Sequence, residues 1–207
     1  MKKMRIMLVA AMLVMVTAVS AQMNLGIKGG VNMSNFYGDE LNDNNVKIGF
    51  HIGLAADYDF AYNSAIQTGL FFTTKGAKYN STVGELSGDV NVNPMYMQLP
   101  VHYAYKIDVS PGTRVVLHAG PYAAFGVGGK SKISGSLGSV GAETETDVFG
   151  DDGFLKRFDA GLGLGVGAEF GPLLLDLGWD MGLVNIVDSS EGDLKNQNAY
   201  LSVGYRF

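Results

Sequence analysis

The sequence predicts an all-β chain, an eight-stranded antiparallel up-and-down β-barrel that crosses a membrane. Three observations predict this fold. Apolar and polar residues alternate in steps of two along long segments, as in strands whose two faces meet different surroundings. Gly supplies 29 of the 207 residues, which disfavours helices, and the chain has no Cys, which excludes disulfides. Short and long connections alternate along the chain, as they do in outer-membrane barrels.

Residues 1–21 are expected to form a cleavable signal peptide. A positively charged start precedes the unbroken apolar run Ile6–Val16, and Val19–Ala21 has the small residues of a cleavage site. The alternative is a membrane anchor, but a spanning helix needs about 20 apolar residues. We therefore expect export from the cytoplasm, with residues 22–207 as the barrel domain.

Two segments carry the alternation without a break. In residues 47–60 one set of alternate positions is wholly apolar: Ile48, Phe50, Ile52, Leu54, Ala56, Tyr58 and Phe60. In residues 157–170 the corresponding set is Phe158, Ala160, Leu162, Leu164, Val166, Ala168 and Phe170. The opposite positions hold Gly, Ala, His and charged residues. Because successive strand side chains point to opposite faces, both segments are predicted to be long amphipathic strands.

Six further segments alternate more weakly and bring the strand count to eight. They are residues 25–34, 65–78, 95–106, 115–130, 173–185 and 199–207. The short connections between strands are residues 59–64, 108–114 and 171–172. The long connections are residues 35–46, 80–93, 131–156 and 186–198. With both termini on the periplasmic side, the short turns fall in the periplasm and the long loops outside the cell.

A secreted, lipocalin-like barrel is the rival fold, with its apolar positions inside and its polar positions in water. The polar set includes the Gly run Gly161, Gly163, Gly165 and Gly167, which suits a crowded lumen better than a solvated face. Aromatic residues of the apolar set gather at the predicted periplasmic strand ends: Tyr58, Phe60, Tyr103, Tyr105, Phe170, Tyr205 and Phe207. Such a girdle is typical of a membrane interface. We therefore expect the apolar face to contact lipid, with the closed sheet pairing its backbone groups.

Four segments resemble the PorT-like outer-membrane β-barrel family, often labelled "porin family": Gln98-Leu99-Pro100, residues 118–122, residues 158–165 and residues 181–186. The closing Gly204-Tyr205-Arg206-Phe207 resembles the aromatic signal that the barrel-assembly machinery recognises, with Tyr205 and Phe207 as its signal residues. The resemblance covers essentially all of the predicted barrel. It implies an outer-membrane barrel of a Gram-negative envelope. It also suggests a component of an envelope secretion or assembly complex.

Eight strands enclose an interior that side chains can fill. The charged and His residues on inward positions are expected to form a hydrogen-bonded network that plugs the lumen, since unpaired charges there would be costly. They are Lys28, His51, Asp57, Lys75, His102, His118, Arg157, Asp159, Glu169, Asp176, Asp180 and Arg206. The alternative function is a narrow, porin-like channel for ions or small solutes.

No catalytic or cofactor site is expected. His51, His102 and His118 share the inward face, and the last two flank one turn at similar distances, which suggests cross-strand neighbours. A metal ion would need a third ligand, which the local spacing does not set. The outward positions offer Thr68 and Thr74 without a His or acidic partner. We therefore expect neither an enzyme nor a metal or other cofactor.

The four long loops hold 13 of the 20 acidic residues: Asp39, Glu40, Asp43, Glu85, Asp89, Glu143, Glu145, Asp147, Asp151, Asp152, Asp188, Glu191 and Asp193. A solvated face is one interpretation, and a recognition surface for a protein partner or a cation is the other. The formal net charge is −5 and no block of Lys and Arg follows the first five residues, which argues against nucleic acid. The predicted protein is a monomer in outer-membrane lipid with a structural or surface-interaction role.

Overall fold

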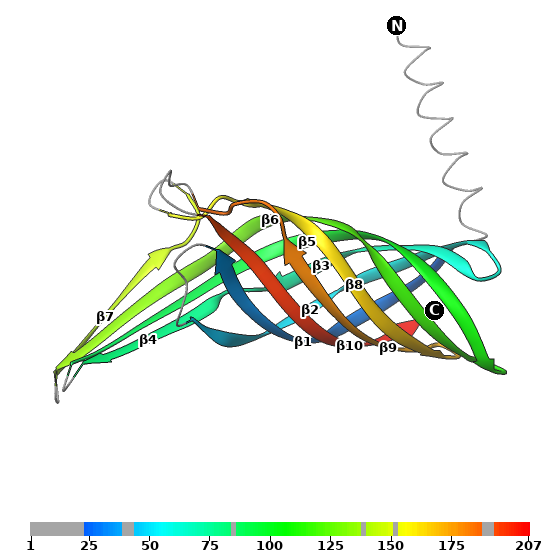
Figure 1. Ribbon diagram of the computed structural model, residues 1–207, viewed down its shortest axis with the longest axis horizontal. Helices are drawn as coiled ribbons and strands as arrows, with labels where there is room; N and C mark the ends of the chain where they lie inside the picture. The colour runs from blue at the N-terminus through cyan, green and yellow to red at the C-terminus, as the bar shows by residue number, and fades with distance from the viewer. Residues whose placement is uncertain (1–22, 39–43, 84–85, 138–139, 151–152, 188–192) are drawn as a thin grey trace, which may run out of the picture.

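The computed structural model is a closed antiparallel barrel with strands tilted across its long axis (Figure 1). It describes residues 23–38, 44–83, 86–137, 140–150, 153–187 and 193–207, so the predicted signal peptide lies outside the described residues. In chain order the strands are β1 (Met23–Gly38), β2 (Asn44–Ala61), β3 (Ser64–Thr74), β4 (Ala77–Val83), β5 (Leu86–Ser110), β6 (Thr113–Leu137), β7 (Val140–Asp147), β8 (Phe158–Phe170), β9 (Leu173–Gly182) and β10 (Leu194–Arg206). Among the described residues, no helix is long and apolar enough to cross a membrane.

The ring has eight positions, which confirms the predicted fold. β3 and β4 share one position, because both pair with β2 on one side and with β5 on the other. The break between them falls at Lys75-Gly76, where Gly76 has a φ of +131° that favours glycine. β7 pairs with β6 outside the ring, and the pairing of β1 with β10 closes it.

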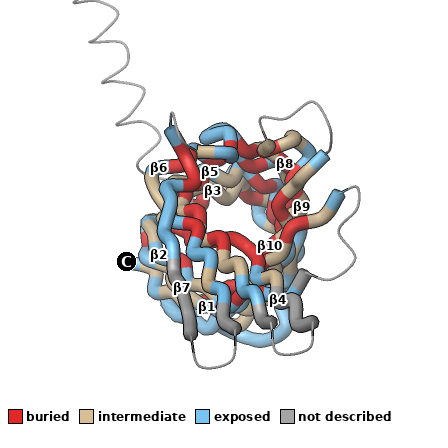
Figure 2. The backbone as a smooth tube through the Cα atoms, turned by 90° about the vertical axis from the view of Figure 1, so that its left-hand side faces the viewer, coloured by how far each residue is buried: buried red, intermediate tan, exposed pale blue. Residues whose placement is uncertain are grey.

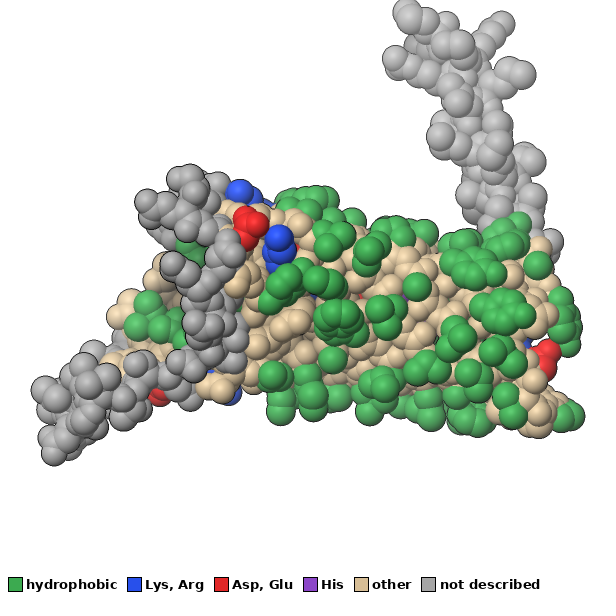
Figure 3. Space-filling model, viewed as in Figure 1, with side chains coloured by type: hydrophobic (Ala, Val, Ile, Leu, Met, Phe, Trp, Pro, Cys, Tyr) green, Lys and Arg blue, Asp and Glu red, His purple; other side chains and the backbone are tan. Residues whose placement is uncertain are grey.

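The alternating pattern places apolar side chains on the outside of the barrel wall. On β2 and β8 these side chains are between 43% and 73% exposed: Ile48, Phe50, Ile52, Leu54, Phe158, Leu162, Leu164 and Val166. The space-filling view shows hydrophobic side chains distributed over the wall (Figure 3). An apolar surface of this extent suits hydrocarbon and not water. The soluble rival would have required the opposite arrangement.

The predicted aromatic girdle lies near the short turns at residues 62–63, 111–112 and 171–172. Six of its seven members are exposed: Phe60, Tyr103, Tyr105, Phe170, Tyr205 and Phe207. Tyr58 is half-buried. These turns lie at the end of the barrel opposite β4 and β7, which marks that end as periplasmic (Figure 1).

Two of the predicted long loops, residues 80–93 and 131–156, are largely strands, so the loop prediction was wrong there; in the other two, β1 and β2 extend to Gly38 and from Asn44, and β10 begins at Leu194. β5 and β6 continue as a paired hairpin to Leu86 and Leu137, while β4 and β7 pair along their outer sides. We call β4, residues 86–92, residues 130–137 and β7 the outer extension (Figure 1, left). Beyond the membrane both faces of a sheet meet water. The alternation of apolar and polar residues therefore fades there, although the strands remain paired.

Candidate functional site: the barrel interior

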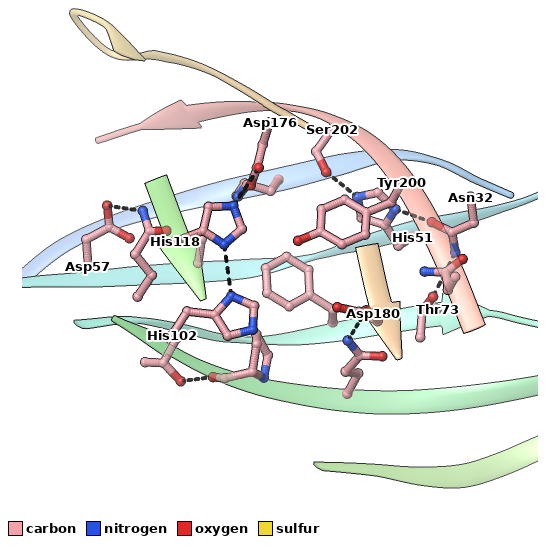
Figure 4. Close-up of a pocket in the computed structure, with 18 residues that line it drawn as sticks. Asn32, His51, Asp57, Thr73, His102, His118, Asp176, Asp180, Tyr200 and Ser202 are labelled. Atoms are coloured by element: carbon pink, nitrogen blue, oxygen red, sulfur yellow. Dashed lines mark hydrogen bonds and ion pairs between the residues drawn. The ribbon is translucent and has the colours of Figure 1, made fainter. Parts of the chain in front are cut away.

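The barrel interior is lined by buried residues, as the view along the barrel shows (Figure 2). Its middle holds a cavity of about 70 Å³, bounded by side chains from β1, β2, β3, β5, β6, β9 and β10 (Figure 4). A cavity of this size has room for several water molecules, since one water needs about 10–15 Å³. We call this space the middle cavity. A charged layer lies on its periplasmic side and an apolar cluster on its outer side.

Two stacked histidines bound the middle cavity. The rings of His102 and His118 are nearly parallel, at 13°, with centroids 5.2 Å apart, and their Nδ1 atoms are 3.1 Å apart. His118 lies opposite Ala104 in the β5–β6 ladder, so His102 reaches it diagonally. On its other side, His118 Nε2 lies 2.9 Å from Asp176 Oδ1, and Asp176 also pairs with Lys28. Four side chains from four strands thus form one chain of contacts.

Two glycines of β8 make room for these rings. A Cβ atom at Gly163 would lie 2.8 Å from His102 Nε2 and 2.7 Å from Asp180 Oδ1. A Cβ atom at Gly165 would lie 2.5 Å from His118 Nε2. Real Cβ contacts are not this short, so any larger residue would displace the imidazoles. The glycine run therefore provides space inside a narrow barrel.

The third histidine belongs to a separate, uncharged set of contacts. His51 Nδ1 lies 2.6 Å from Asn32 Oδ1, and its Nε2 lies 2.7 Å from Ser202 Oγ. The Asn32 amide in turn donates to Thr73 Oγ1 at 2.8 Å. Within the described residues, no three His, Asp or Glu side chains gather in a way that could hold a metal ion. The three histidines therefore do not act as one ligand set.

The two threonines considered from the sequence are held by backbone carbonyls. Thr68 donates from its hydroxyl to the carbonyl oxygen of Pro100 at 2.7 Å, and Thr74 donates to that of Phe50 at 3.2 Å. Thr74 is buried, although the strand pattern placed it on the lipid face. The break after β3 ends the regular alternation at this point.

An ion layer occupies the periplasmic end of the interior. It consists of three carboxylates and three cations: Asp57, Asp59, Glu169, Lys106, Arg114 and Arg206. Lys106 Nζ lies 2.7 Å from Asp59 Oδ1 and 3.4 Å from Glu169 Oε1. Arg206 bridges Glu169 and Asp57 at 2.6 Å and 3.1 Å. The layer has no formal net charge, because it holds equal numbers of opposite charges. Each of its ions lies beside at least one ion of opposite charge, as buried ions require.

An apolar cap occupies the outer end of the interior. Its buried members are Phe36, Ala77, Val92, Tyr96, Tyr122, Ala124, Val148, Phe149, Leu155 and Ile186. Val148, Phe149 and Leu155 follow β7 and Ile186 follows β9, so these connections supply side chains to the buried cluster. The cap was not predicted from the sequence. Its signal was the presence of apolar residues in long connections that are otherwise polar.

Of the twelve residues assigned to the lumen, eleven are buried or half-buried, and Arg157 is the exception. Arg157 is exposed and precedes the first residue of β8; it donates to the Gly126 carbonyl at 2.9 Å and stacks over Phe149 at 5.5 Å. The strand starts one residue later, so the alternation does not apply to it. Asp59, Lys106 and Arg114 of the ion layer were not assigned to the lumen, although Lys106 shares the inward positions with His102 and Asp59 those with Asp57.

The chain matches the family described as "Outer membrane protein beta-barrel domain" over residues 19–188, and it belongs to that family. The fold and the match together define an integral β-barrel protein of the cell outer membrane. No curated protein sequence matches the chain.

Solved barrels of several bacteria resemble the chain. Neisserial surface protein A is 12% identical with a TM-score of 0.47, and the likeness covers 88% of this chain and 97% of that one. OprG from Pseudomonas aeruginosa is 12% identical with a TM-score of 0.44, covering 89% and 95%. Ail of Yersinia pestis is 15% identical with a TM-score of 0.40, covering 90% and 99%. The family assignment rests on the family match and not on these likenesses.

Proposed function

We propose that this protein is a closed barrel with a surface-interaction role, and that the outer extension is its recognition surface. The observation that carries this proposal is the length of β5 and β6, at 25 residues each. A barrel strand crosses a bilayer in about 9–11 residues. The remainder of both strands, paired with β4 and β7, forms a sheet that the membrane does not require.

The packing of the interior favours a closed, structural lumen and not a channel. Side chains fill the barrel at two levels, the ion layer and the apolar cap, and an eight-stranded barrel has little width to spare. Single-channel recording on the refolded protein in a planar bilayer tests this directly. We expect a silent membrane, with heat-modifiable gel mobility as proof of folding. Discrete, reproducible current steps would favour the channel instead.

The chemistry of the outer surface supports a basic partner. Asp89, Glu145, Asp147 and Asp193 are exposed acids at the outer end of the molecule; Glu145 pairs with Lys130 and Lys132 and Asp193 pairs with Lys195, which leaves Asp89 and Asp147 without an ion pair within the described residues. The other predicted loop acids lie outside the described residues or, for Glu143, outside the described side chains. An acidic surface on extended hairpins attracts cationic segments at low ionic strength.

The binding test uses a variant in which residues 131–146 are replaced by Asn-Gly, a two-residue hairpin turn. Immobilised wild-type and shortened proteins are compared for binding of a synthetic Lys-rich peptide and a Glu-rich peptide of equal length. We expect the Lys-rich peptide to bind the wild type, less so at high salt, and to lose most of this binding on the shortened variant. Equal binding to both proteins would contradict the assignment of the recognition surface.

Within the family, we also propose that the chain is a PorT-like barrel assembled through its carboxy-terminal aromatic residues. Tyr205 and Phe207 at the end of the last strand support this, because both are exposed, at 48% and 76%, with ring centroids 6.2 Å apart. A Phe207→Ala variant is expected to reduce the amount of folded protein in the membrane. Phe154→Ala, which changes an exposed aromatic residue away from this end, serves as its control.

A further inference from the structure

The middle cavity is bordered by hydrogen-bond acceptors that lack donors. Among the described residues, five buried side-chain atoms have no partner: Gln98 Oε1, His102 Nε2, Asp180 Oδ1, Asn196 Oδ1 and Asn198 Oδ1. All except Asn196 belong to residues that line the middle cavity. Four of the five atoms are oxygens, so what these atoms lack is hydrogen-bond donors. Buried polar atoms normally have partners, so such a grouping calls for hydrogen-bond donors in the cavity, supplied by water or by a ligand.

The contact between Gln98 and Asp180 fixes which atoms are free. Gln98 Nε2 donates to Asp180 Oδ2 at 2.8 Å. A carboxylate has no hydrogen to give, so Gln98 must present its amide nitrogen and leave its oxygen unpaired. Asp180 is 2% exposed and forms no ion pair within the described residues. A buried carboxylate without a cation is costly, and its second oxygen lacks even a neutral donor.

The histidine contacts make His102 Nε2 an acceptor as well. Asp176 accepts from His118, so His118 carries a proton on Nε2. In the tautomer in which His118 Nδ1 accepts the proton of His102 Nδ1, His102 Nε2 holds a lone pair. This atom and Asp180 Oδ1 both lie close to Gly163 of β8, and His102 and Asp180 both line the middle cavity. Asn198 lies directly opposite Asp180 in the β9–β10 ladder.

We propose that the middle cavity binds a small cation that carries several N–H donors, such as an ammonium or guanidinium group. Asp180 supplies the charge, while Gln98, Asn198 and His102 supply neutral acceptors. A metal ion fits less well, because no three His, Asp or Glu side chains of the described residues gather around one point. This internal site is separate from the proposed role of the outer extension.

The cavities indicate a route from the periplasmic side. A second cavity of about 20 Å³ shares Lys28, Gln67, His118 and Asp176 with the middle cavity. It extends to Leu174, beside the short turn after β8. On the opposite side the apolar cap closes the interior. We therefore infer that a ligand enters from the periplasmic side, past Glu169 of the ion layer, which borders the second cavity.

Isothermal titration calorimetry on the protein purified from membranes in detergent tests the site, with guanidinium chloride and methylammonium chloride as probes. Urea, the neutral counterpart of guanidinium, and sodium chloride at equal ionic strength are the reference titrants. We expect saturable binding of at least one N–H cation and none of urea. Asp180→Asn should weaken binding about tenfold or more, because a charge-assisted hydrogen bond is lost.

Asp108→Asn is the matched control, since it removes the same charge from an exposed position on β5 beside a periplasmic turn, away from both the middle cavity and the outer extension. Its affinity should equal that of the wild type. His102→Phe provides a second test if Asp180→Asn fails to fold, because it keeps a ring at this position and removes the acceptor. Unchanged affinity in the folded variants, equal binding of urea, or no saturable binding of either cation would overturn the proposal. Saturable binding of Zn²⁺ or Ca²⁺ in place of the N–H cations would also overturn it.

Discussion

Lys75 and Asp159 lie 84 positions apart in the chain and form an ion pair at 3.0 Å in which neither side chain is exposed. The Lys75 ammonium also lies 4.5 Å from the centre of the Tyr122 ring, and Asn196 donates to Asp159 at 3.0 Å. The pair thus joins the break between β3 and β4 to the start of β8, directly beside the apolar cap. Each charge is stabilised by the other, because neither side chain is exposed to water.

Replacing Lys75 with Met should therefore destabilise the barrel by about 3–5 kcal/mol, because it leaves the Asp159 carboxylate buried without its cation. Urea unfolding followed by the fluorescence of the single Trp179 measures this change. Lys130→Met is the control, since Lys130 is 61% exposed and its pair with Glu145 is screened by water. Equal effects of the two substitutions would argue against a buried, mutually dependent pair.

The apolar cap predicts a contrast between two phenylalanines in the same connection. Phe149 is 5% exposed and packs edge-on against Tyr96 with ring centroids 5.5 Å apart, whereas Phe154 is 42% exposed. Phe149→Ala should lower the free energy of unfolding by about 3–5 kcal/mol through the cavity that it leaves. Phe154→Ala should have a much smaller effect. Similar urea midpoints for both variants would mean that Phe149 does not hold the cap.

Because the wall spans the bilayer, substitution by arginine is predicted to destabilise the protein by different amounts at different depths. Leu164 lies at the middle of β8 and is 54% exposed, and Val109 lies next to a periplasmic turn and is 65% exposed. Leu164→Arg should destabilise the protein in vesicles by about 2–4 kcal/mol, and Val109→Arg by about 0–1 kcal/mol. Reversed costs would place the bilayer differently on the wall.

The outer extension predicts an unusual acid titration. Hydrogen bonds from Lys130 and Lys132 hold the pKa of Glu145 at about 2, below its ordinary value of 4.5. Because the folded pKa is depressed, the contribution of these contacts is present above about pH 4.5 and is lost as the pH falls toward 2. An NMR titration of the side-chain carboxyl carbon measures the pKa. Lys130→Gln should raise it, and Lys195→Gln should leave it unchanged.

The wall of the barrel was predictable because a bilayer imposes a simple rule on every second residue. Ile48 to Phe60 and Phe158 to Phe170 follow that rule from end to end, and both segments are strands. Beyond the bilayer this alternation is no longer required. β7 pairs with β6 through backbone hydrogen bonds, yet its sequence Val140–Asp147 contains little apolar alternation and was therefore assigned to a loop.

The interior was harder to predict because its contacts join positions far apart in the chain. Alternation alone placed His102, His118 and Asp176 on the inward face. It could not supply the diagonal offset of the β5–β6 ladder, which lets the two rings stack. The contact of Gln98 with Asp180 likewise depends on which strands face each other across the lumen. Such distances follow from ring closure and from the register of every ladder together.

The seam between β1 and β10 has a consequence for the order of folding. The ladder runs from Gly26 opposite Arg206 to Gly38 opposite Leu194, so it joins the first described strand to the last. Such long-range contacts form slowly, because a large loop must close before they contribute. Until β10 is in place, β1 and β9 each keep an unpaired edge that can join with other chains. Synthesis of the last strand must therefore precede stable insertion, and the chain requires protection from aggregation until then.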